Sequence, residues 1–168
     1  QHVKNKSDLV AKILEYSYDR LLNKMDELLA DDTHAIDALL EMSILLNEDM
    51  QMFTPTVTFD LQKYYPDIHR QYLQRTQERV FEAMKVNLEN GISQGVFRKE
   101  VEPKLVATLY VNKIEDMHDP DFYSKNDITF EMIFETMFEN HVRGIANPEG
   151  IAYYEKRNQI CFCFDFNY

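Results

Sequence analysis

The stretch PDIHRQYLQRTQERVFEAMKVNLENGISQG, residues 66–95, predicts the longest element of the chain. Its large apolar side chains recur every three or four residues, which places them on one side of an α-helix of about eight turns. Pro66 suits the first turn of a helix, because that position leaves the backbone N–H unpaired and proline has none. Gly95 suits the stop, since glycine readily adopts the left-handed conformation that ends many helices. The stretch therefore indicates a helical protein.

The same spacing of apolar residues continues on both sides of this helix. It predicts further helices at residues 9–29, 36–50, 58–64, 103–117, 127–145 and 148–157. The expected N-caps of three of them are Ser7, Thr58, and Asn126 or Asp127. With four Gly and five Pro, the chain has little material for the turns of a many-stranded sheet. The expected fold class is all-α, a bundle of about six to seven helices.

The formal charge of −11 argues against this segment binding nucleic acid by itself, since phosphate contacts need clustered Lys and Arg. No stretch approaches the ~20 apolar residues of a membrane span, so no membrane partner is expected. The first residues are polar and lead into no apolar signal-peptide core, which predicts a cytoplasmic protein. Cys161 and Cys163 are expected to be reduced thiols, because a disulfide ring across one residue is strained.

Two pairs of residues have spacings that occur in metal sites. Glu115 and His118 have the spacing that di-iron helical bundles use, but such a site needs a second copy of the motif. Cys161 and Cys163 have no His or Cys nearby to complete a metal site. The sequence also lacks a nucleophile elbow and a phosphate-binding loop. We therefore expect no enzyme, no catalytic residue, no metal and no cofactor.

The Met and aromatic content favours a ligand-binding pocket. The chain has eight Met, eleven Phe and ten Tyr but no Trp, which supplies many adaptable apolar side chains. An apolar pocket edged by tyrosine hydroxyls is a common form of small-molecule site. Plain core packing remains the alternative for each residue. The candidate ligand-binding residues are Met42, Met50, Phe53, Tyr64, Tyr72, Phe81, Met84, Tyr110 and Met117.

Three short motifs occur in order along the chain. They are HVKNKSDL at residues 2–9, NGISQGVFR at residues 90–98 with Pro103 following, and HVRGIA at residues 141–146 with PEG at 148–150. Together they resemble motifs of the TetR family of bacterial transcription regulators. One departure is Val3, which stands where that family usually has Phe. The resemblance implies a DNA-binding regulator, expected to be a repressor.

The resemblance also implies a division of the chain. Residues 1–7 match the end of a helix-turn-helix DNA-binding head, which is expected to precede them. Residues 8–157 then form the helical effector-binding and dimerisation domain, and residues 158–168 an extended or disordered tail. Lys6, and less directly Lys4, match positions that contact DNA phosphate, which a helix N-terminus attracts through its free N–H groups.

By the same resemblance, the partners are a second copy, operator DNA and a small, largely apolar effector. The helices at 103–117 and 127–145 are expected to pair with their copies in a four-helix dimer interface. Effector binding is expected to tilt the first helix and so change the separation of two DNA-binding heads. The residues expected in the dimer interface are Leu109, Phe134, Met137, Phe138 and His141.

Two other classes of function remain open. One is a stand-alone helical module that binds a protein partner through its aromatic side chains. The other is a helical metal enzyme that uses Glu115 and His118. The identity of the effector, the operator and the regulated genes does not follow from the sequence.

Overall fold

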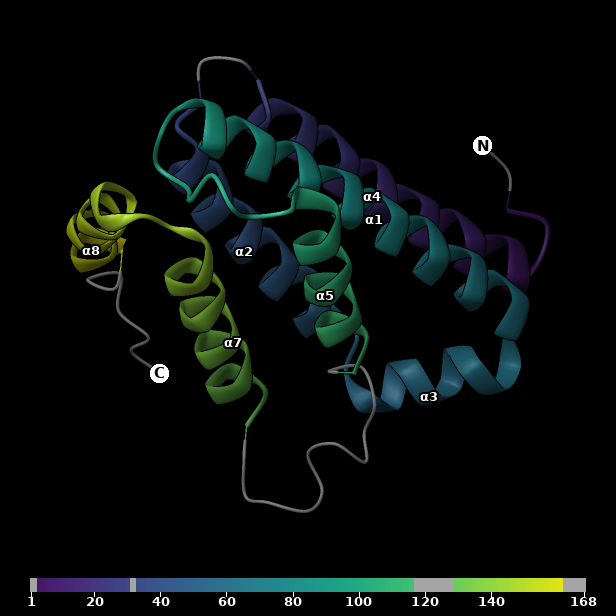
Figure 1. The fold of residues 1–168 in the computed structure, drawn as a ribbon. Coiled ribbons are helices and arrows are strands. Elements are labelled where there is room, and N and C mark those ends of the chain that lie inside the picture. The colour runs from purple at the N-terminus through teal and green to yellow at the C-terminus, as the bar shows by residue number, and fades with distance from the viewer. Residues whose placement is uncertain (1–2, 31–32, 117–128, 162–168) are drawn as a thin grey trace.

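The computed structural model describes residues 3–30, 33–116 and 129–161 (Figure 1). These residues form seven helices and no strand, which confirms the predicted all-α bundle of six to seven helices. The helices are α1 (Lys6–Leu28), α2 (Ala35–Met52), α3 (Pro55–Tyr64), α4 (Pro66–Ser93), α5 (Pro103–Asp116), α7 (Phe130–Ile145) and α8 (Pro148–Cys161).

Helix α4 is the central element of the bundle. It packs against α1, α2, α3 and α5. Figure 1 shows α1 running beside it over much of its length. At the far side of the bundle, α8 packs against α2. Because interiors are close-packed, a displacement of α4 is passed to α1.

Two helices begin at other residues than the sequence predicts. The N-cap of α1 is Asn5, whose side chain accepts a hydrogen bond from a backbone N–H in the first turn, so Ser7 is not the cap. Helix α3 begins at Pro55 with Thr54 as its N-cap, so Thr58 lies inside the helix. In both cases a residue with a capping side chain stands three residues before the N–H that it caps, and this partner decides the start.

The two C-terminal helices also differ from the prediction at one end. Helix α7 begins at Phe130 with Thr129 as its N-cap, whereas the sequence predicted a start at residue 127. The predicted caps Asn126 and Asp127 lie outside the described residues. Helix α8 continues beyond Arg157 to Cys161, so the first residues of the predicted tail are helical.

Buried apolar side chains form two clusters. The smaller cluster, called here the second core, joins α1, α3 and α4 through Leu14, Leu61 and Tyr72. Burying a large apolar side chain contributes about 1.5–3 kcal/mol, so the clusters hold the helices together. The main core joins α1, α2, α4, α5, α7 and α8. Its members include Met25, Ile36, Leu39, Met42, Met84, Leu88, Tyr110, Phe134, Met137, Phe138 and Val142.

The turn after α4 depends on two glycines. A Cβ atom at Gly91 would lie 2.0 Å from Cδ2 of Phe97, whose ring is almost fully buried. The backbone carbonyl of Gly91 accepts hydrogen bonds from the N–H groups of Val96 and Phe97, both at 3.0 Å. Gly95 has a φ of 74°, the left-handed conformation that glycine adopts without strain. The predicted stop at Gly95 thus has a direct physical cause.

This turn packs against the junction between α7 and α8. The N–H of Arg98 donates to the carbonyl of Ile145 at 2.8 Å, and the side-chain amide of Asn147 donates to the carbonyl of Gly95 at 2.6 Å. A Cβ atom at Gly150 would lie 2.1 Å from the carbonyl oxygen of Val96. Two of the three sequence motifs, about fifty residues apart, therefore contact each other.

Candidate functional site

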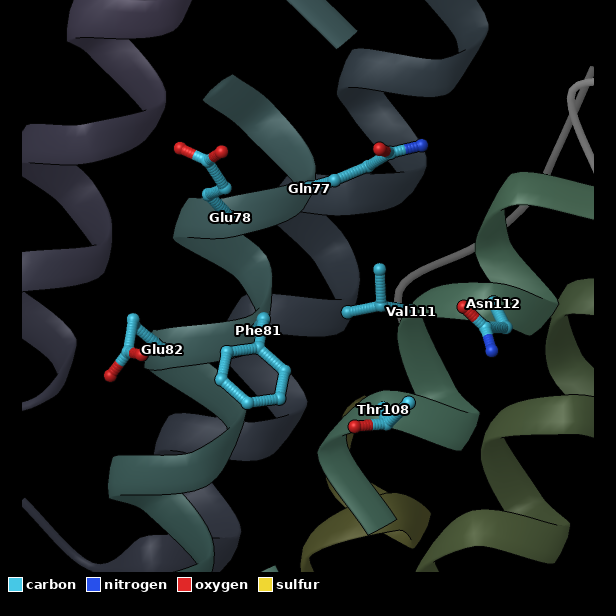
Figure 2. A pocket seen from close by; sticks show the side chains of 7 residues that line it. All are labelled: Gln77, Glu78, Phe81, Glu82, Thr108, Val111 and Asn112. Atoms are coloured by element: carbon cyan, nitrogen blue, oxygen red, sulfur yellow. The ribbon is translucent and has the colours of Figure 1, made fainter. Parts of the chain in front are cut away.

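A pocket of about 490 Å³ opens between α4 and α5 (Figure 2). Its residues recur three or four positions apart on each helix, so each helix contributes one face. Figure 2 shows Phe81 on α4 and Val111 on α5 at its centre. The lining residues are Gln77, Glu78, Phe81 and Glu82 from α4, and Thr108, Val111 and Asn112 from α5.

The lining combines an apolar floor with a polar rim. Phe81 and Val111 are half-buried, so part of each side chain is available to a ligand. The rim supplies two amides, one hydroxyl and two carboxylates, and the lining residues that the structure describes include no Lys or Arg. A few polar groups around apolar side chains are typical of a small-molecule site.

The structure does not bring the predicted ligand-binding residues together. Phe81 lines the pocket, whereas Met42, Met84 and Tyr110 are buried in the main core. A buried residue of a close-packed core has no free surface for a ligand. These three side chains therefore pack the helices of the main core together.

The other predicted ligand-binding residues lie elsewhere. Phe53 and Tyr72 contact each other in the second core, with ring centroids 5.2 Å apart. Tyr64 is 61% exposed on α3. The side chain of Met50 and all of Met117 lie outside the described residues. Helical periodicity marks which residues face inward, but not which inward faces meet.

Sequence reasoning missed a buried carboxylate at the junction of α1, α2 and α4. The hydroxyl of Tyr72 donates to both oxygens of Asp49 at 3.1 Å, and the hydroxyl of Ser17 donates to Oδ1 at 3.4 Å. All three residues are buried. A signal was present in the sequence, because Asp49 follows Met42 and Leu46 at helical spacing on the inward face of α2.

Burial raises the pKa of Asp49 above its ordinary value, because the charged form loses its hydration. The hydrogen bonds from Tyr72 and Ser17, and the nearby charge of Arg20, oppose this shift. Burial also raises the pKa of Tyr72, helped by the Asp49 charge. Tyr72 is therefore a neutral hydroxyl donor that ties α4 to α2.

His141 is a second titratable group, and it is partly buried. Its ring lies 4.5 Å from that of Tyr110, centroid to centroid, where α7 meets α5. Its Nε2 atom is buried and has no hydrogen-bond partner among the residues that the structure describes. Burial, and secondarily the charge of Lys113, lowers the pKa of His141 to about 4. His141 is therefore neutral at pH 7.

The predicted DNA-contact residues lie at the N-terminal end of α1. Lys4 and Lys6 are both exposed, one just before the helix and one at its first position. Asp8 accepts hydrogen bonds from the backbone N–H of Lys4 and from the ammonium of Lys12, both at 3.0 Å. The side chains of Lys4 and Lys6 are thus accessible to an external anion.

The predicted dimer residues fall into two groups. Leu109 is 62% exposed on the outer surface of α5. Phe134, Met137 and Phe138 are buried in the main core of this one chain. His141 is partly buried against Tyr110. Of these five predicted residues, only Leu109 presents a large apolar surface that another chain can reach.

No metal site is assembled in the part of the chain that the structure describes. Within residues 3–30, 33–116 and 129–161, no three His, Cys, Asp or Glu side chains come together as ligands. His118 and Cys163 lie outside those ranges, so the predicted pairs that include them are not placed. Among the same residues, no helix is both long and apolar enough to span a membrane.

No protein-family model, curated protein or solved structure matches the chain. The resemblance to TetR-type regulators therefore rests on the three sequence motifs. Two of those motifs form the contact between the turn after α4 and the start of α8, which is a structural role.

Proposed function

We propose that the chain is the effector-binding and dimerisation part of a DNA-binding transcription regulator. The observation that carries the proposal is the position of the pocket on α4, the helix along which α1 packs. A ligand that separates α4 from α5 changes the surface against which α1 rests. Differential affinity for the two positions of α1 is then what releases DNA.

The surface of α1 supports a domain that precedes it. Leu9, Ile13 and Tyr16 are 44%, 56% and 73% exposed, and their spacing places them on one face of the helix. Contiguous exposed apolar residues mark interaction surfaces. In this proposal, the DNA-binding head covers that face and directs Lys4 and Lys6 toward phosphate.

The outer surface of α5 supports a second copy of the chain as partner. Leu105 and Leu109 are 63% and 62% exposed, one helical turn apart. Thr108 and Asn112 of the pocket share this surface, because Thr108 lies three residues from Leu105 and Asn112 lies three residues from Leu109. The pocket thus adjoins the proposed dimer face, and a ligand there can alter the subunit arrangement.

The proposal is tested with the protein expressed from the natural start codon of its gene. We expect a dimer that protects a symmetric site in the DNA upstream of that gene in a footprinting experiment. We expect Lys6→Ala to weaken this binding and to reduce its salt dependence by about one phosphate contact. Codons upstream of Gln1 that encode no basic three-helix segment would contradict the proposal.

A stand-alone protein-interaction module is the alternative, and the surface of α3 favours it. Val57, Phe59 and Tyr64 are 41%, 59% and 61% exposed there. Lys63 lies over both rings, 5.6 Å from the centroid of Phe59 and 5.2 Å from that of Tyr64. Under this alternative, the expressed protein protects no DNA, and Phe59→Ala weakens capture of a protein partner.

A further inference from the structure

The described residues that line the pocket between α4 and α5 carry charges of one sign. These residues include the acids Glu78 and Glu82, and none of those described is basic. Figure 2 shows both carboxylates on α4, on the side of Phe81 that faces away from α5. The chain as a whole carries a charge of −11, which adds to the negative potential that a ligand meets.

In the part of the chain that the structure describes, each carboxylate has only a weak polar partner. Glu78 accepts a hydrogen bond at 2.9 Å from the neutral amide of Gln74. Glu82 pairs with Lys85 at 3.3 Å, three residues along the same exposed face. Such a surface pair contributes only about 0–1 kcal/mol, so an external cation can share Glu82.

The floor of the pocket suits the apolar part of a cation. The aromatic face of Phe81 carries negative charge density and attracts a cation, an interaction of about 0.5–2 kcal/mol. Val111 supplies apolar surface on the α5 side. The amide oxygens of Gln77 and Asn112 are acceptors for any N–H group that the ligand carries.

We propose that the pocket between α4 and α5 binds a hydrophobic organic cation, with Phe81 beneath its apolar groups and Glu78 and Glu82 as its counter-ions. This inference rests on the proposed function, because it names the chemical class of the effector of the same site. An anion of the same shape meets two carboxylates, and Lys85, which pairs with Glu82, offsets only one of these two charges. The pocket therefore discriminates by charge as well as by shape.

The test compares tetraphenylphosphonium with tetraphenylborate, two ions of nearly the same shape and opposite charge. We expect the full chain to bind the phosphonium at least about tenfold more tightly in calorimetric titrations at low salt. The preference should shrink as salt is raised, because ions screen exposed charges. Equal affinity for the two ions, or tighter binding of the borate, would overturn the inference.

Variants locate the binding site. Glu78→Gln combined with Glu82→Gln should reduce the affinity for phosphonium about tenfold, and Phe81→Ala should reduce it as well. Glu89→Gln is the matched control, because Glu89 is an exposed carboxylate on α4 that does not line the pocket. The same loss in Glu89→Gln would show general attraction to an acidic surface and would overturn the inference.

Two further outcomes separate this inference from the proposed function. If neutral triphenylphosphine oxide binds as tightly as phosphonium and Phe81→Ala abolishes both, the pocket is an effector site without charge selection. The inference then fails and the proposed function stands. If no probe binds and Phe81→Ala instead dissociates a dimer, a second copy occupies the pocket, and the inference fails. Absence of DNA binding by the expressed protein contradicts the proposed function alone.

Discussion

Asp49 is a carboxylate buried among uncharged donors. Its two oxygens accept from the hydroxyls of Tyr72 and Ser17, which come from different helices. A buried acceptor that loses its donor keeps the cost of desolvation without compensation. The three residues therefore act as one polar contact between α1, α2 and α4.

We expect Tyr72→Phe to lower the free energy of unfolding by about 2 kcal/mol, because Asp49 loses its main hydrogen-bond donor. Urea denaturation measures the change. Tyr64→Phe is the control, since removing the exposed hydroxyl of Tyr64 should lower the free energy of unfolding by less than about 0.5 kcal/mol. Combining Tyr72→Phe with Asp49→Asn should cost less than the sum of the single changes. Simple additivity would contradict a direct interaction.

The lowered pKa of His141 predicts that the folded chain loses stability in acid. Its pKa in the folded chain is about 4, below the ordinary value of 6.5. The contribution of His141 to the free energy of unfolding is fully present above pH 6.5. It is lost as the pH falls from 6.5 toward 4, because unfolding then allows the ring to take up a proton. The loss at pH 5 should be about 2 kcal/mol.

The variant His141→Phe tests this linkage, since it keeps an aromatic ring against Tyr110 and removes the titration. We expect wild type to lose about 2 kcal/mol more than the variant between pH 7.5 and pH 5, measured by urea denaturation at each pH. Parallel pH profiles of the two proteins would show that His141 titrates normally.

Among the elements, the turn after α4 carries the tightest steric demand. The ring of Phe97 occupies the space where any side chain at Gly91 would lie. The same turn also contacts the backbone of Gly150. A helix end, a turn and a helix start are thus fitted to one another, and overpacking any of them forces backbone movement.

We expect Gly91→Ala to lower the free energy of unfolding by about 1–3 kcal/mol, because its Cβ atom collides with the ring of Phe97. Gly144→Ala is the matched control. A Cβ atom at Gly144 meets no neighbouring atom within 4 Å, so this change should stabilise α7 by about 1 kcal/mol. Thermal unfolding of both variants gives the comparison. Equal effects of the two changes would contradict the steric argument.

The existence of the helices could be predicted from the sequence, but their starts were less certain. The spacing of apolar residues is a local property, and it predicted α4 from Pro66 to a stop at Gly95. N-caps were mistaken at Ser7 and Thr58 because several Ser, Thr and Asn residues stand near each helix start. The choice among them depends on which side chain reaches a free N–H.

At the scale of the whole molecule, exposed apolar residues lie on separate faces of the bundle. One face is on α1, with Ile13 and Tyr16, and another is on α5, with Leu105 and Leu109. In the proposed function, the first contacts the DNA-binding head and the second contacts another copy. The two contacts are independent and can be tested separately.

We expect Leu105→Glu combined with Leu109→Glu to convert a dimer into a monomer, because a symmetric interface brings the new charges of both copies together. Sedimentation velocity at micromolar concentration measures the change. Phe59→Glu on α3 is the control and should leave the dimer intact, since Phe59 is equally exposed outside the proposed interface. A monomeric unmodified chain would contradict the dimer assignment.

The sequence by itself determined that this is a helical bundle and where most of its helices lie. Helices form through hydrogen bonds between residues four positions apart, so local sequence contains the necessary information. Only the tertiary structure decided that Phe81 faces Val111 across a pocket and that Tyr72 reaches Asp49. These pairs lie 30 and 23 positions apart, and their meeting depends on how whole helix faces pack.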